Sequence, residues 1–149
     1  MSLSIRQATE SDVQLVAILF DQYRVFYEQQ SDLALAQQFI CERIEKSESV
    51  IFLAQEESGD AVGFTQLYPS FSSVSARRTW ILNDLYVTPD ARGTGVGRSL
   101  LEKVETFARA AGAKGIGLQT ATNNLSAQRL YERLGYQKDT DFFSYFLSL

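Results

Sequence analysis

The chain has 149 residues, 45% of them apolar, which suits one domain with an ordinary hydrophobic core. Its 18 acidic and 14 basic residues give a net charge of -4, which disfavours general nucleic-acid binding and suits cationic small molecules. The sequence contains no histidine, so Ser-His-Asp catalysis, Cys-His catalysis and histidine-ligated zinc are excluded. Acid–base chemistry must therefore use Asp, Glu, Tyr, Lys or water.

The first half of the chain is predicted to form a strand, two helices and three strands, at residues 3–9, 11–30, 33–46, 49–57, 61–71 and 78–88. Thr9 is a suitable N-cap for the first helix, and Ser31 or Asp32 starts the second. A glycine-bearing turn joins the first two of the three strands into a hairpin, and Pro89 stops the third.

The second half is predicted to form a helix, a buried strand, a helix and a final strand, at residues 97–112, 114–122, 124–135 and 142–149. Gly112 and Gly135 follow the two helices as typical C-terminal caps. Three consecutive strands followed by βαβ alternation predict an α/β (α+β) fold, in which a mixed sheet carries helices on both faces.

Cys41 is the one cysteine, which excludes an intramolecular disulfide and fits a reducing compartment. Its position in a helical pattern favours a buried structural thiol over a nucleophile. The first residues lack the apolar stretch of a signal peptide, and no run is long enough to span a bilayer. We therefore expect a cytoplasmic protein that binds neither membrane nor nucleic acid.

Glycines alternate at Gly93, Gly95 and Gly97, where a strand ends and the next helix begins. Glycine inside a helix costs about 1 kcal/mol relative to alanine, so bare backbone must serve a purpose here. The amides of a helix's first turn have no intrahelical partner, and the helix dipole favours an anion beside them. Arg92 and Arg98 flank the loop and can neutralise phosphate charge. The alternative is an ordinary glycine-rich turn.

The glycine spacing fits neither common nucleotide motif. The dinucleotide fingerprint requires G-x-G-x-x-G and an acid after the next strand, whereas this chain has G-x-G-x-G followed by a strand that ends LQTAT. A Walker loop requires G-x-x-x-x-G-K-[ST], and the lysine is missing. A nucleotide-binding regulator is therefore the weaker interpretation.

Two segments together resemble the GNAT superfamily of acetyl-CoA-dependent N-acetyltransferases. Arg92, Gly95 and Gly97 match the family loop R/Q-x-x-G-x-G/A. The second signature, N-x-x-A-x-x-L/F-Y-x-x-x-G-F/Y, is matched by Asn124, Ala127, Leu130, Tyr131, Gly135 and Tyr136. The resemblance extends over nearly the whole chain and implies one domain, residues 1–149, with a mostly antiparallel sheet of about six to seven strands. The nearest members are the small histone/polyamine acetyltransferase-like proteins, some of which dimerise.

The resemblance implies that acetyl-CoA is a co-substrate and that no metal takes part. In such enzymes the loop amides hold the pyrophosphate of coenzyme A, which here assigns Arg92, Gly93, Thr94, Gly95, Val96, Gly97, Arg98 and Ser99. The pantetheine arm pairs with the backbone of Leu85, Tyr86 and Val87, where the fourth and fifth strands splay apart. An N–H of Tyr86 or Val87 then polarises the thioester carbonyl, and Asn124 contacts the arm.

Tyr131 matches the family tyrosine that bonds the sulfur and protonates the departing thiolate. The pKa of a thiol is about 8.5 and that of a phenol about 10, so the phenol donates its proton with little mismatch. The alternative is a tyrosine that only packs its helix against the fold.

Asp84 is the candidate that prepares the attacking amine, because a primary amine of pKa about 10.4 must lose its proton first. It precedes the strand end that meets the thioester, in the slot where diamine acetyltransferases carry an acidic residue. The alternative is a carboxylate that faces solvent or supports a turn. Strand alternation predicts that Asn83 and Asp84 lie on opposite faces.

We expect a primary amine, either a small amine such as a polyamine or a peptide amine, as the acceptor. Four aromatic residues lie near Asp84 in the sequence: Tyr68, Phe71, Trp80 and Tyr86. They either make cation–π contacts with the amine or pack in the core. The apolar tail at residues 142–149 either pairs across a homodimer axis or completes the sheet. An acyl-CoA-binding sensor without turnover is the alternative function.

Overall fold

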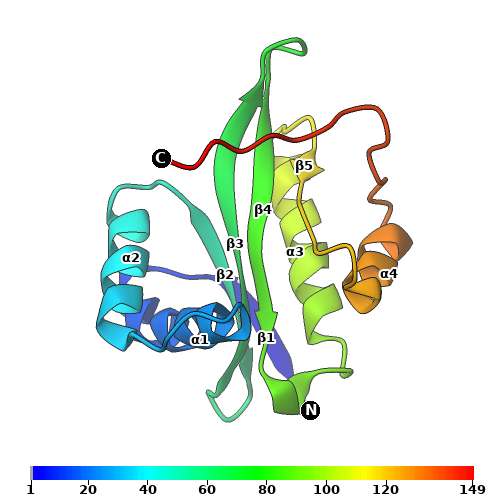
Figure 1. Cartoon of the computed structure of the whole chain (residues 1–149). Coiled ribbons are helices and arrows are strands. Elements are labelled where there is room, and N and C mark those ends of the chain that lie inside the picture. The colour runs from blue at the N-terminus through cyan, green and yellow to red at the C-terminus, as the bar shows by residue number, and fades with distance from the viewer. Residues whose placement is uncertain (1) are drawn as a thin grey trace. The chain divides into compact units, whose positions relative to one another are not determined.

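The structure is a computed structural model that describes residues 2–149 (Figure 1). The chain forms two compact units, one ending at Leu118 and the other beginning at Gln119. The first unit holds the sheet and three helices, and the second holds one helix, α4, Leu125–Arg133.

A five-stranded sheet in the order β1-β2-β3-β4-β5 forms the centre of the first unit. Its strands are β1 Leu3–Gln7, β2 Val50–Glu56, β3 Ala61–Ser72, β4 Arg77–Val87 and β5 Ile116–Gly117. The first four pair antiparallel with their neighbours, and β5 runs parallel to β4. The predicted mixed, mostly antiparallel sheet is confirmed, but it has five strands where six to seven were expected.

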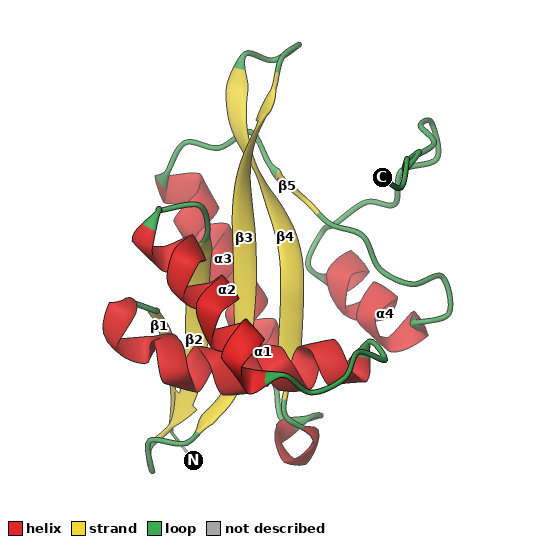
Figure 2. Ribbon diagram, turned by 60° about the vertical axis from the view of Figure 1, so that its left-hand side comes forward, coloured by secondary structure: helices red, strands yellow, loops and turns green. Residues whose placement is uncertain are grey.

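Helices cover both faces of the sheet, as predicted. They are α1 Val13–Phe26, α2 Leu33–Glu45 and α3 Val96–Ala110, with short 3-10 turns η1 at Glu10–Asp12 and η2 at Pro89–Ala91. Figures 1 and 2 show α1 and α2 on one face and α3 on the other. Asp32 starts α2 as predicted, because its side chain accepts a hydrogen bond from the backbone N–H of Leu35.

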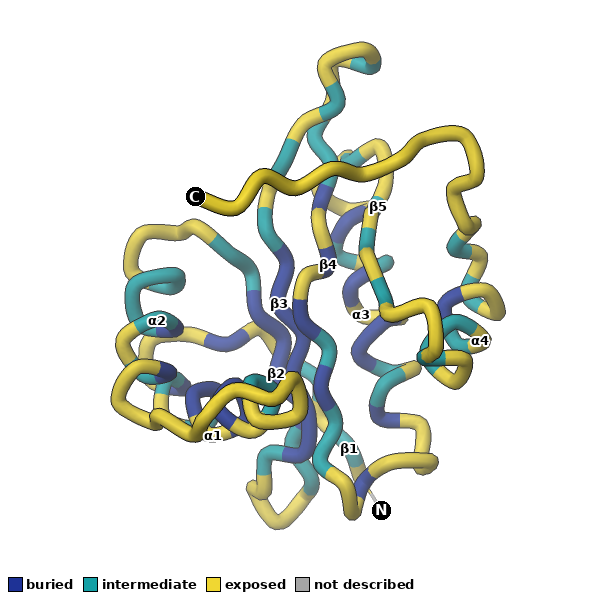
Figure 3. Tube along the Cα trace, viewed as in Figure 1, coloured by how far each residue is buried: buried dark blue, intermediate teal, exposed yellow. Residues whose placement is uncertain are grey.

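Apolar side chains fill both layers, and the buried positions follow the middle of the strands (Figure 3). Under α1 and α2, Phe20 packs edge-on against Phe64 of β3, with ring centroids 6.3 Å apart. On the opposite face, Phe107 of α3 contacts Phe52 and Trp80, with centroid distances of 5.4 and 5.3 Å. Full burial of a phenylalanine side chain contributes about 1.5–3 kcal/mol, so these contacts stabilise the sheet from both sides.

A β-bulge interrupts the pairing of β3 with β4. Gln66 lies opposite Asp84, but Leu67 lies opposite Leu82, so Asn83 is an extra residue on β4. The prediction from simple alternation was wrong here, because the bulge lets the Asn83 side-chain amide donate a 2.9 Å hydrogen bond to Asp84 Oδ1. Asp84 shares a face of the sheet with Gln66, because the two residues lie directly opposite each other on adjacent strands.

Two predicted strands do not form as expected. The strand at residues 114–122 is reduced to Ile116–Gly117. The side-chain amide of Gln128 donates to the carbonyl oxygens of Ala121 and Thr122, so these acceptors serve the turn before α4 instead of a strand ladder. The tail at residues 142–149 has the alternation of a strand but pairs with no other strand among residues 2–149, and strand geometry requires such a partner.

Candidate active site

The glycine loop between β4 and α3 presents backbone amides. Gly93 and Gly95 have φ angles of +77° and +92°, which side-chain-bearing residues rarely adopt. Thr94 Oγ1 donates a 2.5 Å hydrogen bond to the carbonyl of Ala91 and fixes the loop. Gly95 is the N-cap of α3, and no side chain caps the N–H groups of the first turn. A Cβ added at Gly93 or Gly95 would meet no atom within 4 Å, so the outer side of the loop is open.

These features fit a diphosphate such as that of coenzyme A, because unpartnered amides at a helix start favour an anion. Val96, Gly97, Arg98 and Ser99 form the first turn of α3, as the sequence predicts. The loop backbone therefore has the geometry that the predicted anion site requires.

Gly63 of β3 positions this loop and was missed by the sequence analysis. A Cβ at Gly63 would lie 3.0 Å from the carbonyl oxygen of Tyr86, 3.1 Å from Val96 Cγ1 and 3.2 Å from Leu100 Cδ1. Its missing side chain thus lets the start of α3 pack closely on β3 and β4. A lone glycine inside a strand pattern was the signal available for this close approach.

The two arginines that flank the loop both have protein partners. Arg92 Nε donates a 2.9 Å hydrogen bond to the carbonyl of Val87, and its guanidinium lies over the rings of Phe26 and Tyr86. Arg98 Nε contacts Glu102 Oε1 at 2.7 Å, one helical turn away. Protein atoms beside the loop therefore already engage both arginine side chains.

The edge of β4 is open beyond its short pairing with β5. The two strands pair only at Trp80↔Ile116 and Ile81↔Gly117. No strand among the described residues pairs with Leu82–Val87 on that side, so Leu85, Tyr86 and Val87 lie at a free edge. Such an edge can hydrogen-bond an extended ligand that carries amides.

Asp84 lies on the α1 side of β4 and is only 2% exposed, so the solvent-facing alternative is wrong. Gln66 Nε2 donates to Asp84 Oδ2 at 2.5 Å, and Asn83 Nδ2 donates to Oδ1. Burial raises the pKa of the Asp84 carboxyl, and the amide donors oppose that rise. None of the ion pairs found within residues 2–149 includes Asp84. The site is a buried carboxylate held by neutral donors and lacking a cation.

Tyrosines surround this carboxylate. Tyr23 of α1 donates a 3.3 Å hydrogen bond to the carbonyl of Asn83, and its ring lies 6.5 Å from that of Tyr86 and 5.0 Å from that of Tyr27. Burial and the Asp84 charge raise the pKa of the Tyr23 phenol, and they raise the pKa of Tyr68 to about 12. Both phenols therefore stay protonated at neutral pH and can donate.

The predicted aromatic cluster is only partly brought together. Tyr68 and Tyr86 lie on the Asp84 side, whereas Trp80 packs against α3 on the other face and Phe71 is 70% exposed. The sequence analysis missed Gln66 as a site residue. A polar side chain inside the buried run at 62–67 was the signal that could have found it.

The second unit holds the other predicted site residues. Asn124 is the N-cap of α4, and its Oδ1 accepts a 3.2 Å hydrogen bond from the N–H of Ala127. This bond gives the Asn of the signature a capping role at the start of α4. Tyr131 is buried in α4, with its ring 5.7 Å from that of Tyr136.

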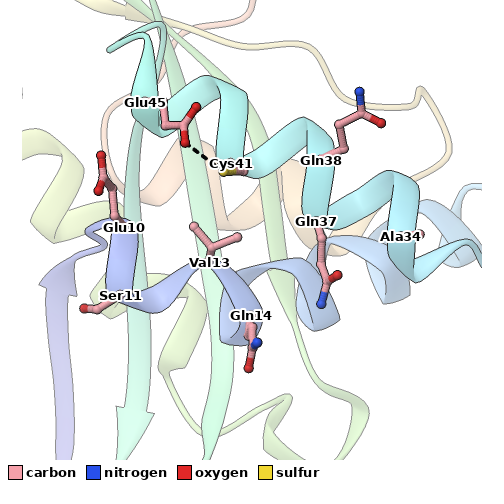
Figure 4. A pocket seen from close by; sticks show the side chains of 9 residues that line it. All are labelled: Glu10, Ser11, Val13, Gln14, Ala34, Gln37, Gln38, Cys41 and Glu45. Carbon is pink, nitrogen blue, oxygen red and sulfur yellow. Dashed lines mark hydrogen bonds between the residues drawn. The ribbon is translucent and has the colours of Figure 1, made fainter.

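A shallow groove lies between the start of α1 and α2 (Figure 4). Cys41 lines it and is partly exposed, so the expectation of a buried thiol was wrong. Its Sγ donates to Glu45 Oε1 at 3.4 Å, and this bond raises the pKa of the thiol. Because the thiolate is the nucleophilic form, Cys41 is a poor nucleophile.

Residues 2–149 contain neither a metal-binding cluster nor a membrane-spanning helix. No three His, Cys, Asp or Glu side chains are grouped so that they could hold a metal ion. No helix in this part of the chain has the length and apolar character needed to cross a membrane.

Comparison with known proteins identifies the family. Residues 13–136 match the Acetyltransferase (GNAT) family. The chain is 51% identical over 147 residues to the uncharacterized N-acetyltransferase YhfO of Bacillus subtilis (strain 168), covering 99% of this chain and 98% of the relative.

Solved structures agree with this match. A crystal structure of a probable acetyltransferase has a TM-score of 0.93 and 40% identity, covering 98% of this chain and 97% of the other. AAC(6')-Iy in complex with the bisubstrate analogue CoA-S-monomethyl-acetylneamine shares the fold, with a TM-score of 0.82, 18% identity and complete coverage of both chains. The chain belongs to the GNAT family of acetyltransferases.

Proposed function

We propose that the protein transfers the acetyl group of acetyl-CoA to a primary amine by direct attack within a ternary complex. The observation that carries the proposal is the buried Asp84 carboxylate, which has no cationic partner among the described residues and lies on β4 just before its open edge. A buried charge needs compensation, and a cationic amine supplies it. A small amine such as a polyamine, or a peptide amine, satisfies this requirement.

The glycine loop and the β4 edge hold the co-substrate in this proposal. The loop amides from Arg92 to Ser99 bind the diphosphate, and the backbone of Leu85, Tyr86 and Val87 pairs with the pantetheine arm. Asn124 also contacts the pantetheine arm. It does so through its side-chain amide nitrogen, because its capping bond uses only Oδ1. AAC(6')-Iy, a structural neighbour, was solved with a CoA bisubstrate analogue.

Asp84 orients the amine and relays its proton through water. Deprotonating a primary amine of pKa about 10.4 at pH 7 costs about 4–5 kcal/mol. A buried carboxylate draws the ammonium out of bulk water and then accepts its proton, because burial raises the pKa of Asp84. Tyr23 and Tyr27 provide aromatic surfaces on which a cationic substrate can lie.

Acetyl-CoA supplies the activated acetyl group as a thioester. The amine nitrogen forms a bond to the acetyl carbon, and the carbon–sulfur bond breaks with its electron pair leaving on sulfur. The backbone N–H of Tyr86 or Val87 polarises the carbonyl, and Tyr131 donates the proton that the departing thiolate takes up. The nitrogen that has formed the new bond releases its extra proton to water, and the Tyr131 phenolate takes up a proton from water, so that the products are the amide and the free thiol. All of these steps use residues within one catalytic domain spanning residues 1–149. We place the reaction in the cytoplasm, a reducing compartment consistent with one free cysteine.

The test is thiol release from acetyl-CoA with a panel of polyamines, amino acids and N-terminal peptides. We expect release with at least one amine and a ternary-complex kinetic pattern. Tight coenzyme A binding without release across the whole panel would instead support a non-catalytic acyl-CoA sensor. Arg92→Glu should weaken coenzyme A affinity without unfolding the protein, and unchanged affinity would contradict the placement of the diphosphate.

We further propose that the protein is a homodimer that uses its C-terminal tail. Six apolar residues of the tail are 81–112% exposed: Phe142, Phe143, Tyr145, Phe146, Leu147 and Leu149. A contiguous exposed apolar segment marks an interaction site, and its period-2 pattern suits pairing with a second copy. Sedimentation should show a dimer for the full chain and a monomer after removal of residues 142–149. A monomeric full chain would contradict this proposal.

A further inference from the structure

Gln66 is buried completely and has one unused hydrogen-bonding group. Its Nε2 donates to Asp84 Oδ2, whereas its Oε1 has no hydrogen-bond partner among residues 2–149. A buried carbonyl oxygen without a donor costs free energy, and native proteins rarely keep one without a reason. Thr65, the preceding residue on β3, differs from Gln66 because its polar group has a hydrogen-bond partner. Its equally buried hydroxyl donates to the backbone carbonyl of Asp84 at 2.8 Å and is satisfied.

The unused oxygen belongs to the same amide group that holds the carboxylate. A half-turn about the last side-chain bond of Gln66 exchanges the positions of Oε1 and Nε2. In the observed orientation the amide donates to an ionised Asp84. In the exchanged orientation Oε1 accepts from the O–H of a protonated Asp84. Asn83 donates to Oδ1 of Asp84. The oxygen whose hydrogen bond with Gln66 changes in this exchange is therefore Oδ2.

We propose that Gln66 is a positioning residue that serves both protonation states of Asp84, so that the carboxylate can take the proton of the amine and release it again. The proposal rests on the proposed role of Asp84 in acetyl transfer. The unpartnered Oε1 is the acceptor reserved for the protonated state. A proton moves from the amine nitrogen to Asp84 and then to water, and Gln66 gains and loses none.

Neutral groups surround Asp84. The titratable groups that face it are Tyr23 from α1 and Tyr68 from its own sheet. Both are neutral phenols at neutral pH, and the charge of Arg43 on α2 acts on Tyr68. Burial raises the pKa of Asp84, and its hydrogen bonds with Asn83, Gln66 and Tyr23 lower it, so these three neutral donors set how readily it ionises against the cost of burial.

Two variants of Gln66 test the proposal, and each is measured in two ways. Gln66→Met keeps the shape of the side chain and removes both polar groups. Because the ionised carboxylate then loses a donor, the pKa of Asp84 should rise by about one unit or more. Gln66→Glu places a second carboxyl group beside Asp84, and the pair should share a proton and titrate at still higher pH. The measurements are a carboxyl-carbon NMR titration of Asp84 and the acid limb of the kcat/KM profile for the amine.

Thr65→Val is the matched control, because it removes a buried hydrogen bond to the Asp84 backbone and leaves the carboxylate untouched. It should lower stability while leaving the NMR titration and the acid limb in place. An unmoved titration in Gln66→Met, or a change equal to that of Thr65→Val, would overturn the proposal. A moved titration in a protein that acetylates no amine would refute the proposed function and leave the Gln66–Asp84 coupling standing.

Discussion

The proposed cofactor loop and the proposed acceptor site are built in different ways. The loop at residues 92–99 offers backbone groups, and its features lie within one short stretch of sequence. The acceptor site depends on side chains from α1, β3 and β4, and a β-bulge at Asn83 brings them together. Backbone sites of this kind can therefore be recognised from glycine spacing, whereas side-chain sites depend on strand register.

The largest effect is expected at the acceptor site. Asp84→Asn should lower kcat/KM for the amine by about 10²–10⁴, the usual contribution of a general acid–base group, because the amide cannot accept a proton. The affinity for coenzyme A should stay the same in calorimetry, since the loop is untouched. Near-normal turnover in Asp84→Asn would assign proton removal to water alone.

The loop is expected to respond to backbone strain. Gly95→Val forces a β-branched residue to a φ of +92°, which costs about 1–3 kcal/mol and displaces the amides. Coenzyme A affinity should fall by roughly ten-fold or more. Gly112→Val imposes similar strain at the C-terminal end of α3, where φ is +73°, and should cost stability only. Equal affinity losses in both variants would show that strain alone, and not the loop, is responsible.

A smaller effect is expected from the second unit. Tyr131→Phe keeps the buried ring and removes the proton that the thiolate takes up, so kcat should fall by about ten-fold. Stopped-flow thiol detection at several pH values measures this. If kcat is unchanged and thermal stability drops, Tyr131 has only the packing role.

The smallest effect concerns an ion pair away from both sites. Arg6 Nη2 lies 2.7 Å from Asp12 Oδ1, and this contact lowers the pKa of Asp12 to about 2. Because the pKa is lowered on folding, the contribution is present above the unfolded value of about 3.8 and is lost as pH falls towards 2. Asp12→Asn should cost about 1 kcal/mol in urea unfolding at pH 7, since the arginine is partly exposed.

The contribution of Asp84 to stability should change with pH in the opposite direction to that of Asp12, because the pKa of Asp84 is raised and that of Asp12 is lowered. Its pKa is raised on folding, so protonation stabilises the native state. This stabilisation is complete below the unfolded pKa and disappears as pH rises through the folded pKa. In urea unfolding, the stability of Asp84→Asn relative to the native protein should therefore rise across that window. A flat difference would mean that Asp84 has an ordinary pKa.

The sequence predicted every helix and the strands up to Val87, because their apolar spacing and their caps, such as Asp32, are local. It also located the glycine loop and singled out Asp84, whose catalytic role stays a prediction. It did not predict the bulge at Asn83, the hydrogen bond between Gln66 and Asp84 or the short β5. Each of these depends on pairing between distant segments, which a linear pattern does not encode.

A backbone amide NMR titration with coenzyme A tests the central claim most directly. The claim predicts the largest shifts at the amides of Gly93 to Ser99, with further shifts at Leu85 to Val87 along the open edge of β4. Binding that leaves these amides unshifted and moves others instead would contradict the account.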